Sequence, residues 1–291
     1  KSDLVVRPDA DPFPQWEGYR FGLEEEETDP MRISFADMRT DASGAFSLPV
    51  TLEEVPDVQA PLKATLRVEV YEFGGRPVIE SVDLPVRDQP LYLGIKPLFP
   101  DEEVPEGSSA QFEIIALDAD GKEQAMPELQ YRLVREEWRY DWFHAGGSWD
   151  YHVSIQDGPA ETGTIAASPT GPAKLAHPVR WGNFRLEVYD PTTGVASSMR
   201  FHAGWSAKPG SGESPDRLQV DSEKEKYQAG ETAQVQLRAP FAGEALITIA
   251  TDRVLSTRVV SLPAEGKVIE IEIGPQWGAG AYVLATAFRP G

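Results

Sequence analysis

Apolar and polar residues alternate along most of this 291-residue chain. The alternation is clearest over 66–71, 111–114, 184–189, 235–237 and 269–273. A period of two residues is typical of β-strands that bury one face and expose the other to water. No segment of the sequence keeps an apolar period of 3.6 residues over three turns, so the pattern predicts a chain built from strands.

Turn-forming residues separate these stretches at short intervals. They are clearest at 41–44, 73–77, 118–121, 190–194 and 264–266. Short strands divided by turns that contain Gly, Asp or Pro are typical of β-sandwiches. We therefore predict an all-β fold.

Changes along the pattern divide the chain into three units and a connector. The units cover 1–90, 91–205 and 216–291, and we expect each of them to form a sandwich. The connector has no large apolar residue and is rich in Gly, Ser and Pro, a composition typical of exposed linkers. It consists of Ser206, Ala207, Lys208, Pro209, Gly210, Ser211, Gly212, Glu213, Ser214 and Pro215.

The last predicted strand offers two faces to the core of the third unit. Tyr282 shares one face with Leu284, whereas Val283 lies on the other. Because an aromatic side chain buries a large apolar area, we expect Tyr282 to enter the core and Trp277 to pack over the preceding turn.

The charge and composition of the chain exclude several classes of protein. Lys and Arg number 27 against 47 Asp and Glu, and the resulting net charge of -20 excludes nucleic-acid binding and an anionic lipid partner. The longest apolar runs are too short to span a membrane. The chain contains no Cys, which excludes disulfides, zinc–thiolate sites and thiol or thioester chemistry within it.

The acidic residues are densest in the first unit, at the run 24–27. A solvated loop or strand edge is one interpretation of this run. A calcium site or a site for a basic partner is the alternative. The segment 118–121 also resembles the start of a calcium loop, but its twelfth position is Leu129, which cannot bind the ion, so we expect a hairpin turn there.

Two aromatic stretches, 137–144 and 149–152, flank a pair of glycines at 146–147. The pattern predicts a hairpin whose rings pair across the strands. A face that binds a glycan or a protein partner through Trp138, Trp142 and Trp149 is an alternative that the sequence leaves open. A metal site is a third interpretation, formed by Asp141, His144, Asp150 and His152.

The sequence carries no motif of an enzyme active site: it lacks a G-x-S-x-G elbow, a P-loop, an H-E-x-x-H pair and a dinucleotide fingerprint. We therefore predict a protein that is not an enzyme and needs no cofactor. The chain starts without Met and stops directly after a predicted strand, so we expect it to be part of a longer polypeptide.

Eight strings of residues, distributed over all three units, lie at 18–24, 74–78, 93–99, 133–138, 179–188, 226–233, 239–247 and 277–283. In this order they resemble bacterial alpha-2-macroglobulins, the large protease-trapping relatives of complement proteins. The string 226–233 is similar to the family's Y-x-P-G-[DE]-T strand opening, with Ala229 in place of the usual Pro. Each string alone is modest, but their order covers nearly the whole chain.

This resemblance implies tandem macroglobulin domains, which are fibronectin-III-like, seven-stranded β-sandwiches. It also implies a periplasmic protein that is anchored to the inner membrane through an N-terminus outside this chain. In the family, a protease cuts a bait segment, and the ensuing rearrangement exposes a thioester in a separate domain. The thioester motif, C-x-E-Q, needs a Cys, which this chain lacks, so either the chain corresponds to domains upstream of the thioester domain or this family member works without a thioester.

The leading interpretation is a non-enzymatic scaffold segment of a periplasmic protease inhibitor. Its expected partners are proteases and, in addition, other proteins of the cell envelope. Because the connector 206–215 is the most exposed stretch that the sequence predicts, it is our candidate for the bait segment. The alternative is a recognition module in which tandem sandwiches bind an envelope protein or a glycan.

Overall fold

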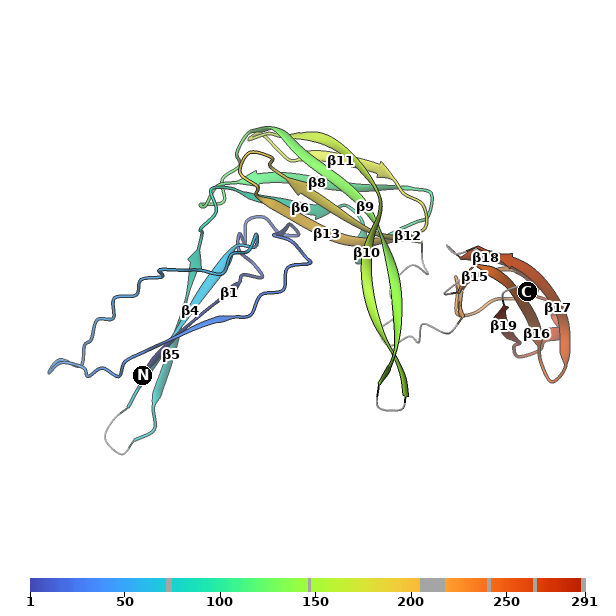
Figure 1. Cartoon of the computed structure of the whole chain (residues 1–291), viewed down its shortest axis with the longest axis horizontal. Helices are drawn as coiled ribbons and strands as arrows, with labels where there is room; N and C mark the ends of the chain where they lie inside the picture. The colour runs from blue at the N-terminus through green and yellow to red at the C-terminus, as the bar shows by residue number, and fades with distance from the viewer. Residues whose placement is uncertain (72–74, 146–147, 205–217, 240–241, 264–265, 289–291) are drawn as a thin grey trace.

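A computed structural model describes residues 1–71, 75–145, 148–204, 218–239, 242–263 and 266–288 (Figure 1). These residues form β-strands and two short 3-10 turns, η1 (Pro100–Glu102) and η2 (Pro275–Trp277), and they contain no α-helix. The prediction of an all-β chain of sheets is confirmed. None of the described segments is a helix that could cross a membrane.

The first unit is built on one antiparallel sheet in the order β3-β1-β4-β5. Its strands are β1 (Ser2–Pro8), β3 (Met31–Phe35), β4 (Leu62–Val70) and β5 (Val78–Val86). Leu4 and Val6 of β1 and Leu62 of β4 are buried on one face. The irregular stretch 36–61 covers that face and contributes Val50, Leu52, Val55 and Val58 to the same cluster. A single sheet covered by an irregular segment therefore takes the place of two packed sheets.

One short strand of the first unit belongs to the sheet of the second. β2 (Arg20–Phe21) pairs antiparallel with β6 (Tyr92–Pro97), with Phe21 opposite Gly94. A side chain at position 94 would meet the Phe21 ring at 2.8 Å, so glycine permits the close approach. The first two units are thus joined by a shared sheet as well as by the chain.

The second unit is a sandwich of two sheets, in the orders β10-β9-β12-β13-β7 and β11-β8-β6-β2. Its remaining strands are β7 (Glu103–Val104), β8 (Ser109–Leu117), β9 (Met126–Ala145), β10 (Ser148–Ala167), β11 (Ala173–Pro178), β12 (Gly182–Tyr189) and β13 (Ala196–Ala203). The core between the sheets includes the fully buried Phe112, Leu186 and Met199. Alternating apolar residues of both sheets supply this core, as the sequence pattern predicts.

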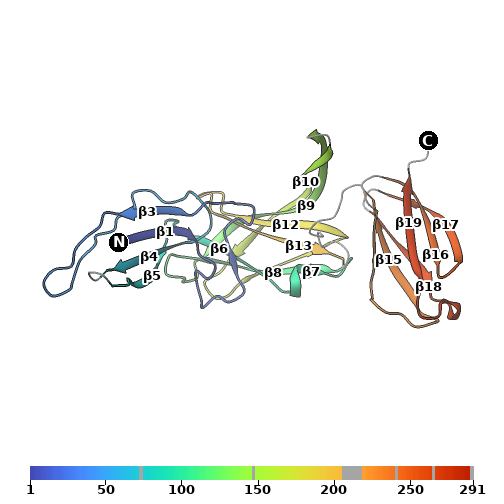
Figure 2. The same ribbon diagram turned by 90° about the horizontal axis from the view of Figure 1, so that it is seen from below.

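The third unit packs two three-stranded sheets, β14-β15-β18 and β17-β16-β19, against each other (Figure 2). Its strands are β14 (Gln219–Ser222), β15 (Thr232–Arg238), β16 (Gly243–Ala250), β17 (Val254–Leu262), β18 (Lys267–Glu272) and β19 (Tyr282–Phe288). The described residues of this unit form six strands, one fewer than the resemblance implies.

The prediction for Tyr282 is wrong. Val283 and Ala285 face the core of the third unit, whereas Tyr282 is 73% exposed on the outer face of β19. Small side chains fit the narrow space between two closely packed sheets better than a tyrosine does. Trp277 is half-buried and packs against the same core, in agreement with its expected place beside the turn.

Candidate functional site

The candidate bait segment lies between two well-formed strands. β13 of the second unit ends at Ala203, and β14 of the third begins at Gln219. The connector 206–215 itself is outside the described residues, so its role stays a prediction. A cut within the connector would therefore break the chain between the second and third units.

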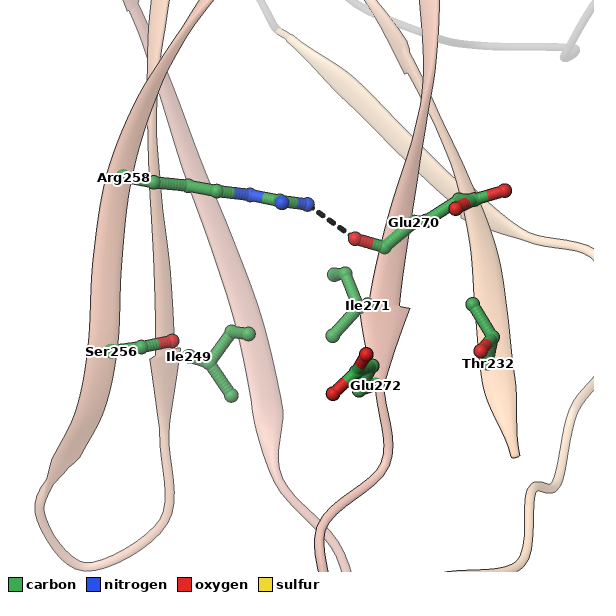
Figure 3. A pocket seen from close by; sticks show the side chains of 7 residues that line it. All are labelled: Thr232, Ile249, Ser256, Arg258, Glu270, Ile271 and Glu272. Carbon is green, nitrogen blue, oxygen red and sulfur yellow. Dashed lines mark hydrogen bonds between the residues drawn. The ribbon is translucent and has the colours of Figure 1, made fainter. Parts of the chain in front are cut away.

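The third unit has an open cavity of about 440 Å³ at the edges of β17 and β18 (Figure 3). Ile249 and Ile271 form its apolar part, and Figure 3 shows their side chains directed toward each other. Arg258 reaches from β17 across the opening and donates a hydrogen bond to the backbone carbonyl of Glu270 on β18. The cavity is therefore the open edge of the sandwich, bridged by one arginine.

The residues that line this cavity do not assemble a catalytic centre. The two hydroxyl groups, of Thr232 and Ser256, have no histidine among the other lining residues that could activate them. Glu270 and Glu272 are balanced by only one basic side chain, Arg258. The chemistry of the cavity agrees better with binding or with simple edge packing than with catalysis.

The aromatic stretches form the predicted hairpin. β9 and β10 pair antiparallel from Ala145 opposite Ser148 down to Met126 opposite Ala167. β12 pairs with β9 only up to Glu136, so the distal half of the hairpin pairs with no third strand among those described. This half projects from the sandwich as a two-stranded ribbon (Figure 1). The prediction of a hairpin is confirmed for the backbone.

The three tryptophans named above lie on this ribbon. By backbone register, Trp138 is opposite Ile155, Trp142 is opposite Tyr151 and Trp149 is opposite His144. Their side chains are outside the description, so the partner-binding role stays a prediction. No group of three metal-ligating side chains occurs among the described residues, and the side chains of Asp141, Asp150 and His152 fall outside them.

The acidic run of the first unit contacts the second unit directly. The Glu24 carboxylate accepts a hydrogen bond from the backbone N–H of Arg200 at 2.7 Å. The Glu25 carboxylate accepts one from the Ser198 hydroxyl at 2.6 Å and lies 3.6 Å from the guanidinium of Arg185. We call residues 24–26 the acidic clasp. Its basic partner, Arg185, lies in the same chain on strand β12, and β13 contributes hydrogen-bond donors.

Beneath the acidic clasp, Arg185 is the centre of an ion network. Its guanidinium lies 2.6 Å from Glu136, 2.8 Å from Glu187 and 2.9 Å from Asp157. Burial disfavours the charged form of Arg185, but the hydrogen bonds and the nearby carboxylates outweigh it and raise its pKa. Arg200 lies 3.0 Å from the same Glu136. Arg185 therefore keeps its positive charge where the clasp docks.

Glu26 completes the acidic clasp through the loop of its own unit. Its carboxylate accepts a hydrogen bond from the Gln59 backbone N–H at 2.8 Å, and the Gln59 side chain accepts one from the Ala196 N–H of the second unit. Burial raises the pKa of Glu26, and Glu25 and Asp57 add to the effect, although the Gln59 hydrogen bond opposes it.

An aromatic cluster adds to the contact between the first and second units. Phe13 and Phe21 of the first unit pack with Tyr92 and Ile115 of the second. The Phe13 and Phe21 rings are 5.0 Å apart in an edge-to-face arrangement, and the Arg87 guanidinium lies 4.9 Å from the Phe13 ring. Apolar packing of this kind stabilises an interface over a wide range of salt and pH.

The segment 118–121 is a hairpin turn, as predicted. Its backbone closes with a hydrogen bond from the Gly121 N–H to the Asp118 carbonyl. The Asp118 carboxylate accepts hydrogen bonds from the N–H groups of Asp120 and Lys122, and the Lys122 bond is the main reason that the pKa of Asp118 is lowered. Trp16 of the first unit donates its indole N–H to the Gly121 carbonyl at 2.9 Å. The turn therefore serves the contact between units.

Comparison with known protein families identifies three consecutive matches. Residues 1–87 match the bacterial alpha-2-macroglobulin MG5 domain, and residues 94–205 match bacterial macroglobulin domain 6. Residues 218–291 match the alpha-2-macroglobulin bait region domain. The three matches follow the order of the units along the chain.

Among curated proteins, the chain is 30% identical to an alpha-2-macroglobulin of Xylella fastidiosa over its whole length, which is 18% of that protein. Among solved structures, it is similar to the native conformation of Escherichia coli alpha-2-macroglobulin, with 26% identity and a TM-score of 0.64 over 100% of this chain and 19% of the other. For the trypsin-activated E. coli protein, the sequence identity is 27% and the TM-score is 0.50, over 95% of this chain and 19% of the other.

Proposed function

The chain belongs to the bacterial alpha-2-macroglobulin family, and on that basis we propose that it is a non-enzymatic scaffold segment of a protease-trapping inhibitor. It spans about a fifth of the length of the curated relatives that it matches. The observation that carries the proposal is the match of residues 218–291 to a bait region domain. The parent protein acts in the periplasm, where it is anchored to the inner membrane.

The connector 206–215 contains or borders the stretch that a protease cuts. A protease draws its target into the active-site cleft in an extended form, so the target must be free of a folded sheet. Gly210 and Gly212 loosen the backbone, and Pro209 and Pro215 oppose its recruitment into a strand ladder. The connector also directly precedes the bait region domain in the sequence.

Mapping the first cuts in the parent protein tests this proposal. Treatment with trypsin or elastase, followed by mass spectrometry, is expected to give a first cut within 206–215 or at Arg217. Trypsin cuts poorly at Lys208 because Pro209 follows it. Replacing 206–215 by a protease-resistant linker of equal length is expected to abolish compaction and trapping with elastase, whereas trypsin keeps its site at Arg217.

The matched control is the same replacement at 38–47, an equally long irregular and exposed stretch in the first unit. This control is expected to leave trapping intact. If trapping of elastase persists after replacement of 206–215, the bait lies elsewhere, and first cuts inside 218–291 would place it in the domain itself.

A recognition role for the hairpin β9–β10 is the second candidate function. Its distal half projects from the sandwich and pairs with no third described strand, an arrangement that leaves both edges of the ribbon open to a partner. Loss of binding to a glycan array or to envelope proteins on Trp142→Ala or Trp149→Ala would support it. Equal binding by these variants and the parent protein would exclude it.

A further inference from the structure

The outer face of the sheet β17-β16-β19 is unusually apolar for a surface. Pairing across the three strands gives four rows of three positions: Ala250 with Val254 and Tyr282, Thr248 with Thr257 and Leu284, Leu246 with Val259 and Thr286, and Glu244 with Ser261 and Phe288. Directly opposed residues lie on one face of a sheet, so these twelve positions form a single surface.

Large apolar side chains fill half of this surface and are exposed. Tyr282 is 73% exposed, Val254 is 61% exposed, and Val259 and Leu284 are each 55% exposed. Leu246 and Phe288 are exposed as well. We call this surface the apolar sheet face. Contiguous apolar surfaces of this kind on a folded protein mark sites of interaction.

The apolar sheet face also has few charged residues. Glu244, at one end, is its single charged residue, although charged residues make up 25% of the chain. The remaining polar positions are threonines and one serine, which can be buried with few unsatisfied groups. An interface core is depleted in charge in the same way.

The opposite sheet of the same unit provides an internal comparison. Across β14-β15-β18, the outward positions include Glu270 and Glu272 beside Gln234 and Thr232, with Val268 as an isolated apolar residue. That surface alternates as expected for a sheet with one face in water. The apolar sheet face departs from this pattern, so solvation alone does not account for its composition.

We propose that the apolar sheet face is covered by another domain of the same full-length protein. The curated relatives are about five times as long as this chain, so the family supplies many further domains. The occupant must present an apolar and uncharged surface to match the face. Two copies of a segment with a net charge of -20 repel each other, which disfavours a second copy as the occupant.

This proposal rests on the family and on the composition of the surface, and it does not depend on protease trapping. Its first test is hydroxyl-radical footprinting of the purified full-length protein, read by mass spectrometry at individual tyrosines. Tyr71 is the internal control, because it is 52% exposed on the first unit. Tyr282 is expected to oxidise at least about three-fold more slowly than Tyr71, since a docked face excludes water. Oxidation of Tyr282 as fast as that of Tyr71, or faster, would overturn the proposal.

A matched pair of variants provides the second test. Val259→Asp places a charge on the apolar sheet face, and Val268→Asp places one on the outer face of the opposite sheet, where valine is also exposed. Val259→Asp is expected to restore fast oxidation of Tyr282 in the full-length protein, and Val268→Asp is expected to leave it slow. An equal response to both variants contradicts the docking.

The oligomeric state identifies the occupant. Protection of Tyr282 in a protein that sediments as a monomer agrees with a domain of the same polypeptide. Protection that disappears on dilution, together with a shift from dimer to monomer, would show that a second copy covers the face and would overturn the proposal. If Val259→Asp fails to fold, the footprint of the unmodified protein still decides whether the face is covered.

Discussion

Arg185 connects two parts of the molecule. It lies at the contact between the first two units, and it also reaches into the interior of the second unit. It bonds to Glu136, whose side chain is only 3% exposed, and it faces Glu25 of the acidic clasp. Removing one partner of a buried ion pair is strongly destabilising, and here Glu136 would keep only the partly exposed Arg200 as its ion-pair partner. Arg185→Met is therefore expected to lower the free energy of unfolding of the second unit by about 3 kcal/mol or more.

Chemical denaturation followed by tryptophan fluorescence measures this loss. Arg132→Met is the control, because Arg132 contacts Glu187 in the same network but is 39% exposed. Exposed pairs contribute little, so the control is expected to cost no more than about 1 kcal/mol. Similar losses of unfolding free energy for the two variants would show that the burial of Glu136 does not determine how much the ion pair with Arg185 contributes.

Glu26 makes the stability of the clasp depend on pH. The pKa of Glu26 is raised, mainly by burial, so the folded state binds its proton more tightly than the unfolded state does. The resulting stabilisation is fully present below the unfolded pKa and is lost as the pH rises through the folded pKa. Glu26→Gln is expected to raise the melting temperature of the first unit at pH 7, while the Gln side chain can still accept the Gln59 hydrogen bond.

Thermal melts at several pH values test this sign. The gain of Glu26→Gln over the unmodified protein is expected to shrink as the pH falls through the raised pKa of Glu26 and to vanish below the ordinary glutamate pKa, where Glu26 is protonated in both states. Glu27→Gln, at the exposed neighbouring position, is the control. A variant less stable than the unmodified protein at pH 7 would mean that the charge of Glu26 stabilises the clasp.

At the scale of the element, β19 has a core face and an outer face that differ in their tolerance of charge. Val283 packs against the core of the third unit, and Thr286 lies on the outer face. Val283→Asp buries a carboxylate without a partner and is expected to lower the stability of the third unit by about 3 kcal/mol or more. Thr286→Asp is expected to cost much less within the unit itself. Differential scanning calorimetry distinguishes the two, and equal losses would contradict the assignment of faces.

β19 also shows what alternation can and cannot predict. The period of two residues gave the strand and the division of its residues into two sets, because both follow from backbone geometry. It did not give which set faces the core, because that depends on the opposite sheet. Choosing Tyr282 by size failed, since the space between the sheets takes Val283 and Ala285 instead.

β2 and the acidic clasp could not be predicted from local patterns at all. A strand of two residues carries no periodicity, and its partner β6 lies about 70 residues away in the sequence. The run 24–27 predicts a concentration of negative charge, but the groups that contact it, such as the Arg185 side chain and the Arg200 backbone N–H, come from distant strands. The hairpin β9–β10 was predictable because its two strands and its turn are adjacent in the sequence.

At the scale of the whole molecule, the two junctions between units differ in kind. The first and second units share a β-sheet through β2, an aromatic cluster and the acidic clasp. The sheets of the third unit contain only its own strands. Among the described contacts between the second and third units is a cation–π pair, in which the Arg238 guanidinium lies 5.2 Å from the centre of the Trp181 ring. Such a pair contributes about 0.5 to 2 kcal/mol.

This difference predicts how the parent protein moves if a protease makes the proposed cut in the connector 206–215. The first two units are expected to move as one rigid body, because separating them would break a strand pair, the aromatic cluster and the ion pairs together. Site-specific spin labels at the exposed Glu80, Lys174 and Asp252, one in each unit, report the motion by pulsed electron resonance. The distance between positions 80 and 174 is expected to change by less than about 2 Å, the scale of rigid-body docking. The distance between positions 174 and 252 is expected to change by more.

Two outcomes would contradict this prediction. If both distances change together, the clasp does not hold the first two units as one body. If neither distance changes after a confirmed cut, the trapping mechanism itself is wrong.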